Sequence, residues 1–242
     1  MKNKLLKMFL IFCLGAFMSA TAFGQENSKD TLKKLEELEK LAQKPLDMWQ
    51  IENLMTLMAQ QNKLGLKPGD ADYRETAAQK TKGGCFGVDG KYLYGDAAKK
   101  ALAGQGDPGA LRTGGANMHM VTTGHIQVAS DGKTAKGIWY SPGFLTETGT
   151  DGKGKAAFDY KRYGVDFVKE DGEWKIWHFI AFTDFITPPN VAWTTKSSVS
   201  NTTIKYETLT ETKGAESKVK APRAYKTFSE TFSYCPEEGS TK

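Results

Sequence analysis

Hydrophobic residues recur at helical spacing in the first part of the chain. Between residues 28 and 44, leucines stand at every third position from Leu32 to Leu41 with charged residues between them, which predicts an amphipathic helix. Pro45 lacks the backbone N–H that a helix interior needs, so we expect this helix to end there. A second helix is predicted from Asp47, a favourable N-cap, to Leu64.

The second predicted helix carries an apolar stripe that includes three methionines. Met48, Ile51, Leu54, Met55 and Met58 fall on one side of it. Methionine fills irregular space in protein interiors, so core packing is the simplest interpretation. The alternative is that the stripe lines a ligand pocket.

From residue 117 onward the pattern changes to the alternation that is typical of strands. Four long strands are expected, at residues 119–129, 134–140, 156–169 and 173–184. Asp-Gly pairs at 131–132 and 171–172 predict the turns of two hairpins. Shorter elements are also expected, namely a hairpin at 85–94, helical segments at 73–80 and 97–103, and an edge strand at 202–210. Helices must cover one face of this sheet because it carries too many aromatic residues to face water, so the expected fold class is α+β with a twisted antiparallel sheet.

The first 24 residues have the layout of a secretory signal peptide. Three lysines within the first seven residues precede an apolar run at 8–17 and a small-residue segment at 19–22. We expect cleavage after Ala22 or Gly24 and a periplasmic or secreted protein, with an uncleaved N-terminal anchor as the alternative. No stable membrane span is expected, because the apolar run is shorter than the roughly 20 residues that a helical span needs.

Removal of those residues lowers the formal net charge from +5 to about +2, since they hold three lysines and no acidic residue. This balance argues against a nucleic-acid partner, which would need a clustered basic face. We expect an N-terminal helix at 25–45, one domain at 46–190 and a C-terminal extension at 191–242. Cys85 and Cys235 remain after cleavage, and in an oxidising compartment they either form a disulfide or stay as free thiols.

The chain has only three histidines, and all of them fall on predicted strands. Regular alternation would place His119 and His125 on one face of the first long strand, and His178 with Phe182 on one face of the last. Imidazole suits proton transfer near neutral pH, and Asp166 would orient His178 as in general acid/base pairs. The alternative for each is a structural histidine. No metal is expected, since His119 and His125 are about 20 Å apart along a straight strand.

Motifs for other chemistry are missing from the sequence. The letters of residues 104–109 match GxGxxG, but they follow a helix and open none, so a dinucleotide site is not predicted. No GxSxG elbow, P-loop or CxxC pair occurs. Aromatic residues crowd the predicted strands and would suit a flat, apolar small molecule.

Two hairpins resemble a known family. Residues 118–128 with 131–140 resemble the central hairpin of SnoaL-like proteins, of the nuclear-transport-factor-like superfamily. Residues 163–178 resemble the final hairpin, where Asp-Gly followed by Trp, a basic residue and Ile is the most specific part. The helix from Asp47 matches the leading helix, so the resemblance covers roughly residues 46–190.

The resemblance implies a cone in which a curved antiparallel sheet wraps around N-terminal helices and leaves a pocket at the open end. It implies a cofactor-free lyase or isomerase that uses acid/base catalysis on a small aromatic or polycyclic molecule, and a homodimer as one form. His119 inherits the acid/base role, with His178 and Asp166 as its partners and Tyr140 holding a substrate oxygen. The expected substrate-binding residues are Tyr140, Tyr163, Thr123, Met55, Trp139 and Phe182. The alternatives are a non-catalytic periplasmic module that binds a small molecule or a partner, and a purely structural envelope protein.

Overall fold

The structure is a computed structural model that describes residues 25–103, 117–148, 152–190, 221–228 and 233–239. The expected signal peptide at 1–24 and edge strand at 202–210 lie outside these ranges. The chain divides into two compact units, residues 1–43 and 44–242, and the division falls inside helix α2 (Gln25–Leu64). No helix in the described ranges combines the length and the hydrophobicity that crossing a membrane would require.

Helix α2 corrects the prediction of two separate helices, because it continues through Pro45. Proline leaves one carbonyl unbonded, four residues earlier at Leu41. Leu41 is 65% exposed, so water can satisfy that carbonyl. After Pro45 the apolar stripe is buried from Ile51 onward, with Met55 at 0% and Met58 at 5% exposure, whereas Met48 is 40% exposed.

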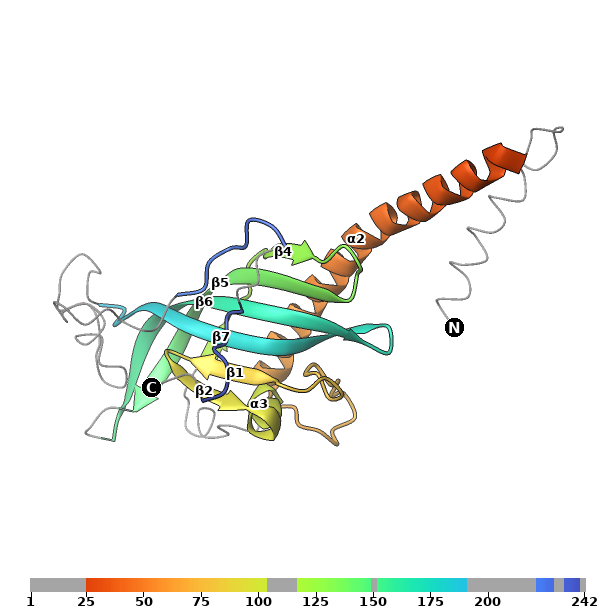
Figure 1. Ribbon diagram of the computed structural model, residues 1–242. Coiled ribbons are helices and arrows are strands. Elements are labelled where there is room, and N and C mark those ends of the chain that lie inside the picture. Colours follow the sequence, from red (N-terminus) through yellow and green to blue (C-terminus); the bar gives the residue numbers. More distant parts are fainter. Residues whose placement is uncertain (1–24, 104–116, 149–151, 191–220, 229–232, 240–242) are drawn as a thin grey trace. The chain divides into compact units, whose positions relative to one another are not determined.

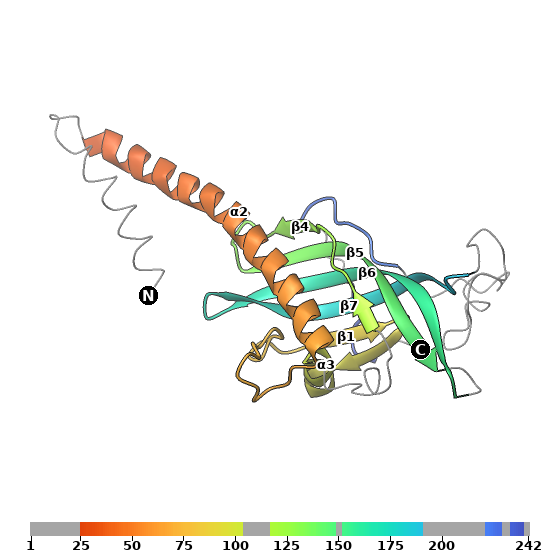
Figure 2. The ribbon, with the colours of Figure 1, turned by 180° about the vertical axis from the view of Figure 1, so that it is seen from behind.

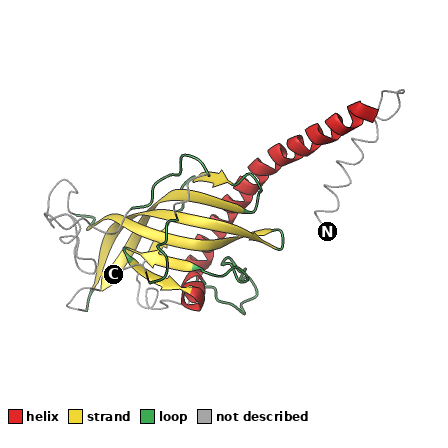
Figure 3. Ribbon diagram, in the orientation of Figure 1, coloured by secondary structure: helices red, strands yellow, loops and turns green. Residues whose placement is uncertain are grey.

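The second unit is built on one curved sheet (Figures 1 and 3). The other elements are β1 (Cys85–Val88), β2 (Lys91–Tyr94), α3 (Gly95–Leu102), β3 (Asn117–His119), β4 (His125–Val128), β5 (Thr134–Thr148), β6 (Gly154–Glu170) and β7 (Glu173–Thr187). The strand order is β2-β1-β7-β6-β5-β3, and β4 also pairs with β5. Every pair is antiparallel except β1 with β7. The predicted α+β class is confirmed.

Local turn chemistry fixes the hairpins that the sequence predicted. Asp171 and Gly172 both have positive φ, 52° and 84°, which is the backbone of a tight turn whose twist matches the strands. The predicted helix at 73–80 is wrong, because this segment pairs with β7 instead. The amide of Ile176 donates to the carbonyl of Thr76, and the amide of Ala78 donates to the carbonyl of Ile176.

The first long strand is not continuous, and this separates two histidines that were expected on one face. Between β3 and β4 the chain passes over the indole of Trp139, where a Cβ added to Gly124 would lie 2.2 Å from a ring atom. Glu52 on α2 accepts hydrogen bonds from the Gly124 amide and from Trp139 Nε1, at 2.8 and 3.1 Å. His119 faces the helix side of the sheet, whereas His125 Nε2 lies 3.1 Å from the Tyr225 carbonyl on the other side.

A β-bulge in β7 reverses the expected faces of that strand. Asp166 pairs with His178 and Phe167 pairs with Ile176, so Trp177 is an extra residue. Ile176 therefore belongs to the core against α2, but His178 points to the opposite face. Regular alternation along the last strand, which would also put Ile176 on the face of His178, therefore fails at Trp177.

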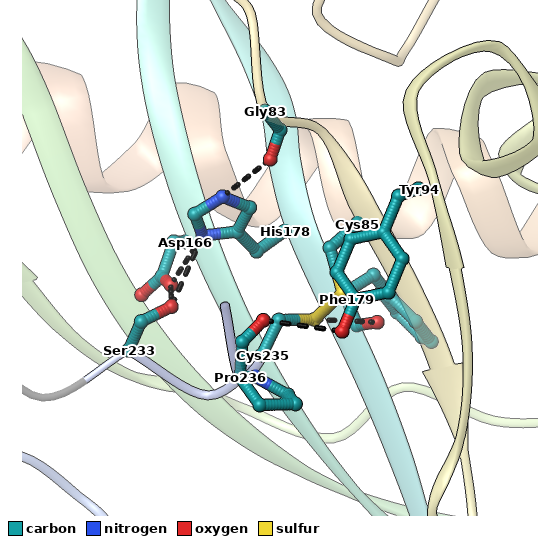
Figure 4. The surroundings of a disulfide bond; sticks show 9 residues. All are labelled: Gly83, Cys85, Tyr94, Asp166, His178, Phe179, Ser233, Cys235 and Pro236. Carbon is teal, nitrogen blue, oxygen red and sulfur yellow. Dashed lines mark hydrogen bonds and ion pairs between the residues drawn. A yellow bond between two sulfur atoms is a disulfide. The ribbon is translucent and has the colours of Figure 1, made fainter. Parts of the chain in front are cut away.

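The two faces of the sheet are covered by different parts of the chain (Figures 1 and 2). The main core lies on the side of α2, and the C-terminal segments 221–228 and 233–239 cross the other side. A disulfide between Cys85 and Cys235 fastens the C-terminal segment to β1 (Figure 4). Gly164 permits this close cover, since a Cβ there would lie 2.6 Å from the ring of Tyr234.

Candidate functional site

A pocket of about 230 Å³ opens on the helix side of the sheet, within the second unit. Its walls come from α2, α3, β1, β3, β6 and β7, and most of them are apolar. The lining residues are Met58, Ala59, Asn62, Lys63, Phe86, Val88, Ala101, Leu102, His119, Lys161, Tyr163, Phe179 and Ala181. Three side chains able to exchange or donate protons, His119, Lys161 and Tyr163, thus share one small pocket with a hydrophobic surface.

His119 reaches across the sheet because of a glycine. In the strand register, His119 on β3 is opposite Gly143 on β5, which is opposite Asp159 on β6. A Cβ at Gly143 would lie 2.4 Å from His119 Nδ1, so any other residue would occupy the space of the imidazole. The ring lies over β5, and its Nε2 comes within 3.3 Å of Asp159 Oδ2.

Asp159 is a fully buried carboxylate beside two cationic or titratable groups. Its side chain has no solvent exposure, and Lys161 Nζ lies 2.7 Å from the same Oδ2. Burial raises the pKa of Asp159, but the interaction with His119 and the charge of Lys161 outweigh this and hold that pKa below its usual value. The carboxylate is therefore ionised at neutral pH.

This arrangement selects one form of the His119 ring. Because Nε2 faces a carboxylate, the favoured neutral tautomer carries its proton on Nε2 and leaves Nδ1 as an acceptor. Nδ1 is buried and has no hydrogen-bond partner among the described residues, nor has Ser141 Oγ. Neither oxygen of Asp159 has a well-aligned hydrogen bond within the same part of the chain, so its contacts with His119 and Lys161 are close charge contacts.

Tyr163 adds a neutral donor to the same pocket. Burial, with the negative charge of Asp159, raises the pKa of Tyr163 to about 12, so its hydroxyl keeps its proton. Its ring lies 5.0 Å from that of Phe179, which in turn stacks on Phe86 with a centroid distance of 5.6 Å. The pocket therefore joins a flat aromatic wall to hydrogen-bonding groups.

His178 and Asp166 pair as the sequence suggested, but they do not line this pocket. His178 Nδ1 lies 2.9 Å from Asp166 Oδ2, and its Nε2 lies 3.0 Å from the Gly83 carbonyl, so both ring nitrogens have partners (Figure 4). Asp166 also accepts hydrogen bonds from Ser233 at 2.8 Å and from Tyr225 at 3.3 Å. The pair thus binds the C-terminal segments to the outer face of the sheet.

Of the other expected site residues, only Tyr163 lines the pocket with His119. Tyr140 is 62% exposed and Thr123 is also exposed. Met55 and Trp139 are fully buried in the core. Phe182 packs beneath the guanidinium of Arg162, on the outer face.

Sequence reasoning missed Asp159 and Lys161, although a signal was present. Both alternate with Tyr163, Val165 and Phe167 on β6, so they fall on the face that the apolar residues mark as core. A charged residue on the core face of a strand is seldom buried without a partner or a function. Within the described ranges, no three His, Cys, Asp or Glu side chains are grouped so that they could hold a metal ion.

The fold is that of α+β proteins in which a curved sheet and a long helix enclose a pocket. The chain carries a SnoaL-like domain, since residues 73–180 match the model of that family. The resemblance seen in the sequence is confirmed over that range. No curated protein is detectably similar to this chain in sequence.

Several solved structures are similar to the chain. A candidate scytalone dehydratase from Novosphingobium aromaticivorans is 21% identical, with 62% of this chain and 91% of that chain covered and a TM-score of 0.44. The hexachlorocyclohexane dehydrochlorinase LinA-type3 from Novosphingobium barchaimii is 16% identical, with 64% and 96% covered and a TM-score of 0.43. An NTF2-like protein with a cystatin-like fold from Novosphingobium aromaticivorans is 16% identical, with 74% and 99% covered and a TM-score of 0.37.

Proposed function

We propose that this protein is a cofactor-free lyase or isomerase in which His119 transfers a proton to and from a small, largely apolar substrate. The observation that carries the proposal is the placement of His119 in the pocket wall against the buried, ionised Asp159. A carboxylate at this distance orients the imidazole and stabilises the imidazolium that forms when the ring takes a proton.

The reaction needs only groups that this pocket contains. The His119 imidazole takes a proton from a carbon next to a carbonyl, and the electron pair of that C–H bond moves onto the carbonyl oxygen. The Tyr163 hydroxyl stabilises the resulting oxyanion. Return of the proton to a different carbon completes an isomerisation, whereas loss of a leaving group from the adjacent carbon completes an elimination.

The dimensions of the pocket limit the substrate. A volume of about 230 Å³ is below the range of roughly 300–1,000 Å³ that is typical of sites for drug-sized ligands. The aromatic wall of Phe86 and Phe179 favours a flat molecule. A substrate of one or two fused rings meets both conditions.

The test is deuterium uptake from D2O into small aromatic ketones such as 2-tetralone and 1-indanone, followed by NMR. We expect exchange at the carbon next to the carbonyl, and a loss of about 10²–10⁴-fold in the His119→Ala variant. His125→Ala is the matched control, because His125 lies on the opposite face of the sheet. Binding of the ketones with no exchange, or exchange unchanged in His119→Ala, would refute the catalytic proposal and favour a binding module.

We also propose that the protein is exported. The N-terminal layout described above and the disulfide between Cys85 and Cys235 support this, since disulfides persist mainly in oxidising compartments. Mass spectrometry of the protein from fractionated bacterial cells should give a periplasmic or secreted chain that begins after residue 22 or 24. A full-length chain in the cytoplasmic fraction would contradict the proposal.

A further inference from the structure

The charges that line the pocket all have one sign. The lining includes Lys63 and Lys161 as well as His119, and none of the thirteen lining residues that the structure describes is acidic. Among the described residues, the carboxylate that contacts this lining is Asp159, which lies against both His119 and Lys161. A ligand that enters this pocket therefore meets an excess of positive charge.

Lys161 has hydrogen-bonding capacity left over. Its side chain is 19% exposed, and its ammonium carries three N–H donors, none of which makes a well-aligned hydrogen bond with Asp159 despite the close charge contact. The described residues supply no other partner for it. A largely buried ammonium with unused donors is costly unless a further acceptor binds to it, and an anionic oxygen is the strongest acceptor.

The apolar part of the lining demands a different chemistry. Phe86 and Phe179 stack in parallel, and Met58, Val88 and Leu102 complete a surface that has no charged group. A ligand that satisfies both walls has a flat apolar body and an anionic group at one end.

We propose that the pocket binds a small aromatic carboxylate, with its carboxylate on Lys161 and its ring against Phe86 and Phe179. Lys63 lies exposed at the end of α2 and adds positive charge at the entrance. As a statement about the substrate, this inference rests on the function proposed above, whose flat carbonyl compound would carry the carboxylate. It concerns binding, so it can be tested without turnover.

The probes are three molecules of matched shape, namely 2-naphthoate, 2-naphthamide and 2-naphthamidine, measured by titration calorimetry with the full-length protein. We expect the carboxylate to bind at least tenfold more tightly than the neutral amide, and the cationic amidine to bind most weakly. Added NaCl should weaken the binding of the carboxylate and leave the binding of the amide unchanged. Equal affinities, a preference for the amide or amidine, or no binding of any probe at millimolar concentration would overturn the inference.

The Lys161→Met variant should lose the preference for the carboxylate. The control is Lys155→Met, which replaces an exposed lysine of the same strand and should keep the preference. If Lys161→Met does not fold, as judged by circular dichroism, Lys63→Met takes its place. That variant should bind the carboxylate about threefold more weakly. Preference for the carboxylate without any His119-dependent exchange would leave this inference standing and remove the proposed enzyme. His119-dependent exchange of ketones without any preference for the carboxylate would leave the proposed enzyme standing and overturn this inference.

Discussion

Replacement of Gly143 by alanine tests whether the glycine positions His119. The added Cβ would lie 2.4 Å from His119 Nδ1, 2.6 Å from Cε1 and 2.8 Å from the carbonyl oxygen of Met118. Ordinary contacts between such atoms begin near 3.5 Å, so the imidazole must retreat by about 1 Å. The carbonyl of Met118 is backbone, so β3 must shift as well.

That displacement has a calculable effect on the site. His119 Nε2 is already 3.3 Å from Asp159 Oδ2, and a retreat of the ring by about 1 Å lengthens this contact further. We expect a loss of about 10²-fold in deuterium exchange, because a misplacement of about 1 Å in a catalytic group has that effect. Overpacking of this kind also lowers the free energy of unfolding by about 1–3 kcal/mol.

The assays are deuterium exchange, urea unfolding, and NMR of the histidine ring nitrogens and protons. Gly84→Ala is the control, since its added Cβ would meet only the Trp177 carbonyl, at an ordinary 3.6 Å. The ring signals of His119 should shift in the Gly143 variant and stay unchanged in the Gly84 variant. A Gly143→Ala protein with native His119 signals and native exchange would refute the role assigned to this glycine.

Three further predictions concern other parts of the second unit. Asp159→Asn should reduce exchange by about 10²-fold while leaving binding of 2-naphthamide unchanged, because the amide no longer stabilises an imidazolium; equal exchange would contradict the pairing. Burial would raise the pKa of Glu170, but hydrogen bonds from residues 79–81 lower it to about 2. The contribution of Glu170 to the free energy of unfolding is therefore complete above the unfolded pKa near 4.5 and is lost as pH falls toward 2. Glu170→Gln should therefore lower the free energy of unfolding by about 1 kcal/mol at pH 7, after allowance for solvent screening, and by less at pH 3; urea titrations at the two pH values measure the difference. Replacement of both Cys85 and Cys235 by serine should lower the free energy of unfolding by about 2–5 kcal/mol, since their bond closes a loop with a sequence separation of 150 residues. An unchanged free energy of unfolding would show that the bond is dispensable.

The sequence predicted those parts of the fold that short-range chemistry decides. The Asp-Gly turn at 171–172 and the alternation along β6 were sufficient to place the final hairpin. The break before Gly124 and the bulge at Trp177 depend on contacts with Trp139 and between strands, which alternation cannot reveal. A single extra residue in β7 moved His178 to the other face.

The candidate site was predicted in part for the same reason. His119 and Tyr163 were identified because their side chains suit proton transfer and ligand contact, and both line the pocket. No carboxylate was predicted beside His119, because Asp166 was paired with His178, and the register that brings Asp159 opposite Gly143 is a property of the folded sheet. Attention to charged residues on the apolar face of β6 would have found it.

The disulfide also sets a limit on when the molecule can be completed. Cys235 follows Cys85 by 150 residues, so their bond cannot form until synthesis has passed Cys235. The hydroxyls of Tyr225 and Ser233, which donate to Asp166, are also made only after β6 and β7 are complete. A chain that ended before Tyr225 would retain the residues that line the pocket but would lack these partners on the outer side of the sheet.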